Sequence, residues 1–400
     1  MPSSVLFMER KQWQSVSVGI TTAMVGFTSS FAVVLAGLTA VGATTAQATT
    51  GLLFLCALVG TGTIWLTLRH RAPLTLAWST PGAAILVSTG AAEDSWPTTV
   101  GAFLVAGSLL VLTAALPRLG RLITAIPASL AQAMLAGVLL SLCVQPIAAV
   151  IDTPLTVGPV LLTWVVLARF APRWATPTAF VLALALAVLD VLGREETLDV
   201  PSPLFTFTMP SPTVSAVIGI ALPLYILTMA SQNVPGAAIM ASYGYTVPWR
   251  ESLFLTGAGT MLGSPAGGHA INLAAITAAL PASPEAHPDR QRRWLAAHAA
   301  GWAYIALAVL TPTLVALASA APAGLIEAVA GLALLGTLTS ALSAAMRERT
   351  QQLAVVITFV TAASPIVVFG IGPSLWSLVV GLIVWTIFAS KKTPSDPQER

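Results

Sequence analysis

Polar side chains that could bind a small anion are concentrated at three places within otherwise apolar sequence. They lie at 79–80 (Ser-Thr), 231–233 (Ser-Gln-Asn) and 268–272 (Gly-His-Ala-Ile-Asn). Hydroxyl, amide and imidazole groups donate hydrogen bonds to anions, and histidine also exchanges protons because its ordinary pKa is about 6.5. The sequence offers no paired carboxylates with metal spacing and no nucleophile with its base, so we expect binding and proton exchange, and no enzymatic activity.

Two residues are candidates for carrying a proton. His269 is the histidine that falls inside a predicted break of an apolar segment. Proton coupling through its imidazole competes with a second interpretation, in which a neutral His269 contacts the ligand or holds the local geometry. Glu327 is the one carboxylate inside an apolar span, although its place near the span's end also fits a side chain at the membrane surface. No second ligand lies at helical spacing from His269, so we expect no metal and no other cofactor.

The candidate ligand contacts lie in these polar stretches or at the corresponding place in the first apolar run. Hydrogen bonding between helices is the alternative role for Gln232 and Asn233. Ordinary packing is the alternative for Phe27. The full set is Phe27, Thr28, Ser29, Ser79, Thr80, Gln232, Asn233, Gly268, His269 and Asn272.

The composition places these residues in a membrane protein. The chain is 56% hydrophobic and 8% charged, with a mean hydropathy of +0.86, whereas soluble domains carry about 25% charged residues. A soluble enzyme is therefore excluded. The net charge of +3 does not indicate a nucleic-acid partner, because the basic residues sit in short loops between apolar runs. Cys56 and Cys143 lie inside such runs and predict neither a disulfide framework nor a thiolate metal site.

Apolar runs of about 17 to 25 residues mark the membrane-spanning segments. Three runs, at 73–92, 231–262 and 263–281, are interrupted by Pro, Gly and polar residues. Sharing 231–262 between the end of one span and the whole of the next gives fourteen spans. The first run is too long for a cleaved leader, whose apolar core has about 7 to 15 residues. The clear runs are 14–41, 49–68, 98–116, 122–150, 155–170, 174–192, 212–230, 294–317, 323–345, 351–369 and 372–389.

The charged residues predict the orientation of these spans. With an even number of crossings, all Lys and Arg residues except Arg194 fall on one side, and basic loops face the cytoplasm. The opposite side collects acidic residues, most of them in the Pro-containing loop at about 190–211. Both termini are therefore predicted to be cytoplasmic, in the inner or plasma membrane.

The acidic loop divides the chain into two parts of seven spans each. Because seven is odd, the two parts must lie in opposite orientations, as an inverted repeat. The interrupted third and tenth segments correspond, and Pro81 and the pair Gly267-Gly268 predict that each enters extended and becomes helical only afterwards. A helix that starts inside the membrane presents free N–H groups and a positive dipole end to an anion. Simple Pro or Gly kinks are the alternative.

Three motifs resemble the benzoate:proton symporter (BenE) family. This family shares a fold with nucleobase transporters and the sulfate-transporter group. Nucleobase transporters of this fold commonly carry acidic residues in segments 8 and 10, whereas this chain has amides and a histidine there, which suits an anionic ligand. The motifs are Ser231-Gln232-Asn233-Val234-Pro235-Gly236, Gly267-Gly268-His269-Ala270-Ile271-Asn272-Leu273-Ala274-Ala275-Ile276-Thr277 and Ser79-Thr80-Pro81-Gly82-Ala83-Ala84.

The resemblance implies an all-α membrane protein with two domains and short strands in segments 3 and 10. Dimers are frequent in that fold, so a homodimer is a further expectation. The implied divisions are a core domain at 14–116 (segments 1–4) and 212–317 (segments 8–11), a gate domain at 117–192 (segments 5–7) and 318–390 (segments 12–14), an outer acidic loop at 193–211 and a cytoplasmic tail at 391–400.

The sequence and the resemblance together predict a transporter that imports benzoate or a similar aromatic carboxylate with a proton. In this hypothesis the core domain moves against the gate domain, and Phe27 stacks on the substrate ring. Two alternatives remain open: a nucleobase:proton symporter, and an anion exchanger or channel of the sulfate-transporter type.

Overall fold

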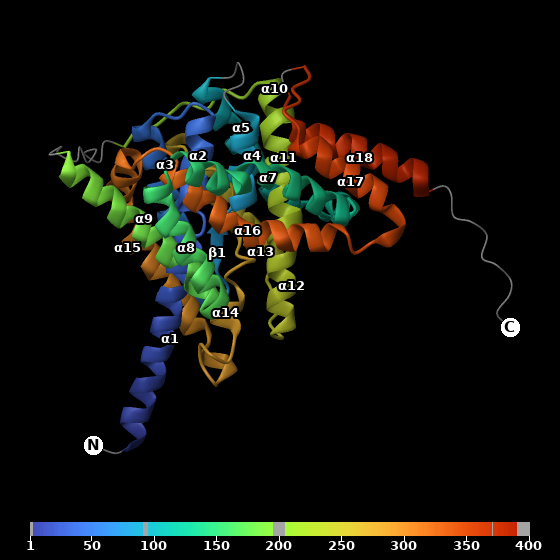
Figure 1. Ribbon diagram of the computed structural model, residues 1–400. Coiled ribbons are helices and arrows are strands. Elements are labelled where there is room, and N and C mark those ends of the chain that lie inside the picture. The colour runs from blue at the N-terminus through green and yellow to red at the C-terminus, as the bar shows by residue number, and fades with distance from the viewer. Residues whose placement is uncertain (1–2, 91–94, 195–204, 370, 390–400) are drawn as a thin grey trace, which may run out of the picture.

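The computed structural model describes residues 3–90, 95–194, 205–369 and 371–389, and they form a bundle of helices around one pair of short strands (Figure 1). Within this part of the chain, 8 helical stretches are long and apolar enough to cross a membrane. Three shorter apolar helices accompany them, at Pro154–Phe170, Gln352–Ala363 and Pro373–Phe388. The predicted class, a mostly helical membrane protein, is confirmed. The long stretches are Trp13–Ala40, Thr45–His70, Trp96–Ala115, Ala128–Asp152, Pro172–Gly193, Val214–Ser242, Arg290–Ala320 and Leu325–Ala345.

Several of these stretches consist of more than one element. The first contains α1 and α2, separated by a break at Ser29 and Ser30. The stretch Val214–Ser242 is the upright helix of Figure 1 in which α10, α11 and α12 follow one another with two π-helical turns between them. The named helices are α1 (Ser3–Thr28), α2 (Phe31–Ala40), α3 (Thr45–His70), α4 (Thr80–Thr89), α5 (Trp96–Ala115), α6 (Pro117–Thr124), α7 (Ala128–Asp152), α8 (Pro154–Phe170), α9 (Pro172–Gly193), α10 (Val214–Ala216), α11 (Leu222–Leu227), α12 (Val234–Ser242), α13 (Trp249–Gly263), α14 (Ala279–Ala282), α15 (Trp294–Ala320), α16 (Leu325–Ala345), α17 (Gln352–Ala363) and α18 (Pro373–Ala389).

The two strands, β1 (Leu76–Trp78) and β2 (Ile271–Leu273), pair antiparallel at the centre of the bundle. Ala77 lies opposite Asn272 in the register. Both strands fall in the interrupted segments, so the prediction of short strands there is confirmed. A two-stranded sheet leaves outer backbone groups unpaired, which is costly away from water.

Side chains of neighbouring helices satisfy some of these outer groups. Thr63 of α3 accepts a hydrogen bond from the Leu76 amide at 3.0 Å, and Thr260 of α13 accepts one from the Ile271 amide at 2.9 Å. Each threonine belongs to the helix that precedes the strand in the chain. The two breaks are therefore supported in the same way.

The long helices pack closely through glycine. A Cβ on Gly301 of α15 would lie 2.9 Å from the Gly60 carbonyl oxygen of α3, and a Cβ on Gly257 of α13 would lie 2.8 Å from the Gly107 carbonyl oxygen of α5. Small residues at such crossings let helix backbones approach each other, which is how helices associate within lipid. These contacts fix the helices that carry Thr63 and Thr260.

The structure corrects one predicted segment and agrees with the division of another. The run at 14–41 is not one continuous helix, because the Ser30 hydroxyl donates to the Gly26 carbonyl at 2.7 Å and the chain bends there. The prediction that 231–262 is shared between the end of one span and the whole of the next agrees with the structure, because one helix continues to Ser242 and α13 follows from Trp249. A π-helical turn at Thr228–Asn233 absorbs the polar run without ending the helix.

Two predicted helical regions are shorter than expected. The segment after β2 does not become a long helix: α14 has 4 residues, and Pro281, Pro284 and Pro288 each remove an amide donor from this region. The run at 351–369 stops being helical at Ala363, since Ser364 precedes Pro365. The tail at 391–400 and much of the acidic loop at 193–211 lie outside the described residues.

Candidate functional site

Ser79 is the centre of a hydrogen-bond network at the end of β1. It caps α4, where its hydroxyl accepts from the Gly82 amide at 3.1 Å and from the Thr228 hydroxyl at 2.9 Å. Its own amide donates to the Ala270 carbonyl at 2.8 Å. One residue thus joins the first break to the second break and to the helix that contains the polar run.

His269 is fully buried beside this cap. Its Nε2 lies 3.0 Å from the Ser79 carbonyl oxygen, which can only accept, so we assign the Nε2 proton to the histidine. The Phe103 ring lies edge-on to the imidazole, with 6.3 Å between ring centroids. Nδ1 is buried and has no hydrogen-bond partner among the described residues. The imidazole therefore keeps one nitrogen available for a proton.

Two asparagines hold the second strand in place. Asn233, in the π-helical turn, is fully buried; its Oδ1 accepts from the Leu273 amide at 2.9 Å and its Nδ2 lies 3.4 Å from the Met229 sulfur. The Asn272 amide, oriented to satisfy its neighbours, donates to the Leu273 carbonyl at 2.7 Å and accepts from the Ser79 amide at 3.0 Å. Both side chains are occupied by the backbone.

A cavity of about 20 Å³ lies beside the strands, between the end of α1, the start of α4 and α15. A site of this size is close to the minimum for one water molecule, so a benzene ring would need it to widen. Predicted residues that line it are Ser29, Thr80 and Gln232. The rest of its lining is Gly26, Ser30, Ala77, Trp78, Ala274, Ala275, Ile276, Thr277 and Tyr304.

Seven of the ten predicted residues therefore fall into two groups. Ser29, Thr80 and Gln232 line the cavity, whereas Ser79, Asn233, His269 and Asn272 form the network that supports the strands. Gly268 is buried and donates its amide to the Gly263 carbonyl at 2.9 Å, away from the lining. Thr28 donates to the Met24 carbonyl at 2.8 Å within its own helix.

Aromatic rings gather at one wall of the cavity. Phe27 stacks on Phe31 with 5.0 Å between ring centroids, and Phe180 of α9 lies edge-on to Phe31 at 5.5 Å. Trp78 lies edge-on to Phe27 at 5.8 Å and also to Tyr304 at 5.8 Å. Phe27 is thus placed behind Trp78 and does not line the cavity.

Sequence reasoning missed Phe180 and Tyr304. Nothing in the spacing of α9 distinguishes Phe180 from an ordinary packing residue. Tyr304 carries a signal that could have found it, because a tyrosine hydroxyl inside an apolar span usually needs a polar neighbour. Its hydroxyl lies against Gly26, where a Cβ would have no room.

Glu327 lies apart from this network. It is exposed in the first turn of α16 and lines a groove of about 450 Å³ together with Thr39, Thr45 and Ser319. None of the residues that line the small cavity lines this groove. Among the described residues, no group of three or more His, Cys, Asp or Glu side chains could hold a metal ion.

Comparisons with known proteins agree with this architecture. The structure is similar to the transmembrane domain of a cyanobacterium bicarbonate transporter, BicA, with a TM-score of 0.62, 14% identity and coverage of 93% of this chain and 98% of that chain. It is also similar to the murine Solute Carrier 26 family member A9 anion transporter, with a TM-score of 0.61, 12% identity and coverage of 95% and 68%. The chain therefore shares the fold of these two membrane proteins.

The sequence gives the family. The model of the benzoate membrane transport protein family matches residues 10–387, and the chain belongs to that family. It is 36% identical to the inner membrane protein YdcO of Escherichia coli (strain K12), over 92% of this chain and 94% of that protein. It is 31% identical to the benzoate membrane transport protein of Acinetobacter baylyi (strain ATCC 33305 / BD413 / ADP1), over 82% and 83%. The chain is therefore a transporter and not an enzyme.

Proposed function

We propose that this protein imports benzoate or a similar small aromatic carboxylate together with a proton. The observation that carries the proposal is the cavity beside the strand pair, which combines ring surfaces with hydrogen-bond donors. Trp78 and Tyr304 contribute aromatic surface to the lining, and Thr80 and Gln232 contribute polar groups for a carboxylate. None of the residues that line it is acidic.

The carboxylate would lie at the start of α4. The Gly82 and Ala83 amides are already bonded to Ser79, whereas no hydrogen bond of the described residues uses the Thr80 amide. The positive end of the helix dipole adds to this donor. An anion can thus be held without a fixed cation, and the absence of an acidic side chain avoids repulsion.

His269 would couple the proton to the substrate. Its free Nδ1 can take a proton, and the Ser79 carbonyl on Nε2 ties the imidazole to the cap of α4. A protonated imidazole and a bound carboxylate favour each other, which is the thermodynamic requirement for coupling. Glu327 is the second candidate, reached through the separate groove at the start of α16.

The proposal includes the wider architecture predicted from the sequence. It comprises fourteen segments in a 7+7 inverted repeat, with the core domain moving against the gate domain during alternating access. The protein would lie in the inner membrane with both termini in the cytoplasm, and a homodimer is the proposed assembly. In this arrangement Phe27, Phe31 and Trp78 belong to the core domain and Phe180 to the gate domain.

The fold supports a second candidate function. Both solved structures named above are described as transporting bicarbonate or anions, which suggests proton-independent transport of a small inorganic anion. Nucleobase:proton symport is the third candidate, but the amides in the π-helical turn of Val214–Ser242 and the histidine beside β2 take the place of the acids it would use.

Uptake of radiolabelled benzoate into proteoliposomes tests the proposal. Purified protein should accumulate benzoate above equilibrium only with an inward proton gradient. His269→Gln can keep a hydrogen bond to the Ser79 carbonyl but cannot carry a proton, so it should lose gradient-driven accumulation and keep benzoate counterflow. His70→Gln, which changes a histidine paired with Glu251, is the matched control.

Other outcomes would overturn parts of the proposal. Accumulation that survives in His269→Gln would move the proton role to Glu327 or to a proton carried on the substrate. Absence of benzoate uptake, combined with uptake of bicarbonate or uracil, would show that the substrate class is wrong.

A further inference from the structure

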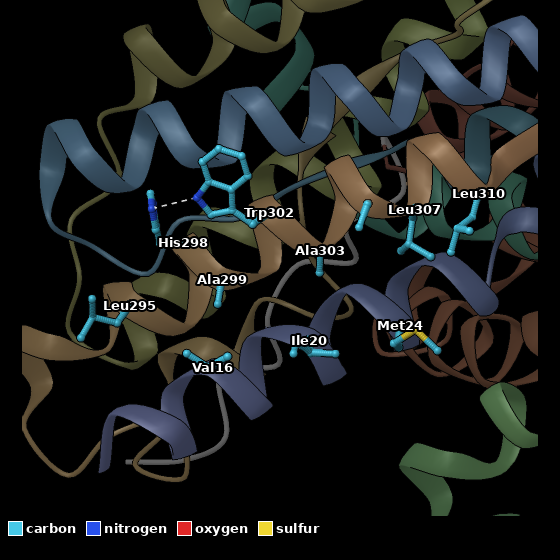
Figure 2. Close-up of a pocket in the computed structure, with 11 residues that line it drawn as sticks. Val16, Ile20, Met24, Leu295, His298, Ala299, Trp302, Ala303, Leu307 and Leu310 are labelled. Atoms are coloured by element: carbon cyan, nitrogen blue, oxygen red, sulfur yellow. Dashed lines mark hydrogen bonds between the residues drawn. The ribbon is translucent and has the colours of Figure 1, made fainter. Parts of the chain in front are cut away.

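An apolar groove of about 800 Å³ runs between α1 and α15, on the outside of the bundle (Figure 2). Val16, Ile20 and Met24 of α1 form one wall, and Ala299, Ala303 and Ala306 form the floor on α15. The volume lies within the range of about 300 to 1,000 Å³ that ligand sites occupy. The groove is separate from the small cavity, with which it shares no lining residue.

The groove lies along membrane-spanning helices. It extends on α15 from Leu295 to Leu310, which corresponds to about 22 Å of helix, a large part of the roughly 30 Å hydrocarbon core. Trp302 and Leu310 flank it and are 58% and 53% exposed. Its surroundings are therefore hydrocarbon, and an extended apolar chain fits its shape.

A cation, Arg71, lies just beyond the lining residues at one end of the groove. His298, which lines the groove, accepts from the Trp302 indole at 3.2 Å, and its ring contacts the Trp294 ring at 5.8 Å. The Arg71 guanidinium lies over that Trp294 ring, 4.2 Å from the centroid. A row of rings thus leads from the groove to Arg71 (Figure 2 shows the part from His298 to Trp302).

The Arg71 guanidinium is exposed and available for an anion as far as the described side chains are concerned. The neighbouring Arg69 and His70 both pair with Glu251, whereas Arg71 makes no ion pair with any side chain that the structure describes, which excludes the side chains of residues 3–12. It is exposed at the end of α3, next to the start of α15. An unpaired cation at the end of an apolar groove complements an anionic headgroup attached to an acyl chain.

We propose that this groove binds an anionic phospholipid of the surrounding bilayer, with one acyl chain along α1 and α15 and the phosphate at Arg71. A second copy of this chain is a less suitable occupant of the groove. In a two-fold symmetric contact the same groove would face itself, so neither copy would present a ridge to fill it. The site does not depend on the transported substrate, so it stands or falls separately from the proposed function.

Native mass spectrometry of the full-length protein in mild detergent tests the proposal, with phosphatidylglycerol and phosphatidylcholine of identical acyl chains as probes. The wild type should retain phosphatidylglycerol about fivefold better, as expected for one basic residue near an anionic headgroup. Arg71→Gln should remove this preference. Ala306→Phe, at an exposed position in the floor, should lower retention of both lipids.

Arg169→Gln is the matched control, since Arg169 is also exposed and lies over an aromatic ring, Phe170 at 5.5 Å, but lines no part of the groove. It should behave as wild type. Ala299→Phe fills the same groove and replaces Ala306→Phe if that variant misfolds. The proposal is wrong if Arg71→Gln keeps the wild-type preference, if Arg169→Gln loses it equally, or if the filling variants change only a monomer–dimer equilibrium.

Discussion

The two interrupted segments, at β1 and β2, support their strands in the same way but differ in the structure that follows the strand. Each strand takes support from a threonine of the preceding helix, Thr63 for β1 and Thr260 for β2. After β1 the chain turns at once into the ten-residue α4, capped by Ser79. After β2 it continues without regular structure and reaches only the four-residue α14.

Because of this difference, the two breaks offer different groups to a ligand. The first break offers a helix N-terminus, so its contribution to an anion site is backbone donors and a dipole. The second break lacks a helix long enough for that role and contributes buried side chains, His269, Asn272 and the partner Asn233. If the proposed function holds, the first break would hold the charge of the substrate, and the second would hold the strand and carry the proton.

The largest expected effect comes from removing the support of β2. Asn233→Leu leaves the buried Leu273 amide without its acceptor, which costs about 1 to 3 kcal/mol of unfolding free energy. Thermal unfolding in detergent should show the loss, and benzoate uptake should be abolished because the strand moves.

Gln232→Leu is the control for Asn233→Leu. Gln232 lines the cavity, so this variant should unfold near the wild-type temperature and show only a raised KM. Equal destabilisation by the two variants would mean that Asn233 has no special role in holding β2.

A smaller effect is expected at the first break. Ser79→Ala removes the cap of α4, worth about 1 kcal/mol, and leaves the Thr228 hydroxyl without its acceptor. Benzoate binding, measured by calorimetry, should weaken several-fold because the start of α4 loosens. Ser95 is the N-cap of α5, but its side chain makes no capping bond. Ser95→Ala should therefore leave both the stability of the protein and its affinity for benzoate unchanged.

The sequence was sufficient to place the breaks because proline and glycine act locally. Pro81 and Gly267-Gly268 marked β1 and β2, and the family resemblance added the strands themselves. These local signals could not predict the length of the helix that follows each break. It depends on whether Pro281 and the prolines that follow it stop a helix that packing would otherwise favour.

The candidate site was predictable in its residue types but not in their roles. Gln232 and Asn233 are adjacent, yet one lines the cavity and the other binds the Leu273 amide. About 100° of helix rotation separates neighbouring positions, and a π-helical turn changes that angle, so the sequence alone could not decide which side chain faces the cavity. Phe180 comes from a distant helix, α9, and only the fold brings it to Phe31.

The next effect concerns the aromatic contact beside the first break. Phe180→Leu removes an edge-to-face contact with Phe31, worth about 0.5 to 1.5 kcal/mol beyond the buried area. If this contact joins the moving halves, the KM or maximal rate of benzoate uptake should change several-fold while the protein stays folded. Phe54→Leu, which removes contacts with Phe205 and Phe207 elsewhere, should leave transport unchanged. An unaltered rate in Phe180→Leu would make Phe180 a packing residue only.

The smallest effect is expected at Glu327, and it tests whether the proton is carried at the second break or at the start of α16. Glu327 is exposed at the start of α16 and shares no lining residue with the cavity, whereas His269 is fully buried and bonded to Ser79. Glu327→Gln should therefore change gradient-driven benzoate accumulation by less than about twofold, since exposed charges couple weakly to distant sites. His269→Gln in the same assay should abolish it. A Glu327→Gln variant that loses accumulation but keeps counterflow would reverse the assignment, because it would place the proton in the groove that Glu327 lines and leave the second break with a structural role alone.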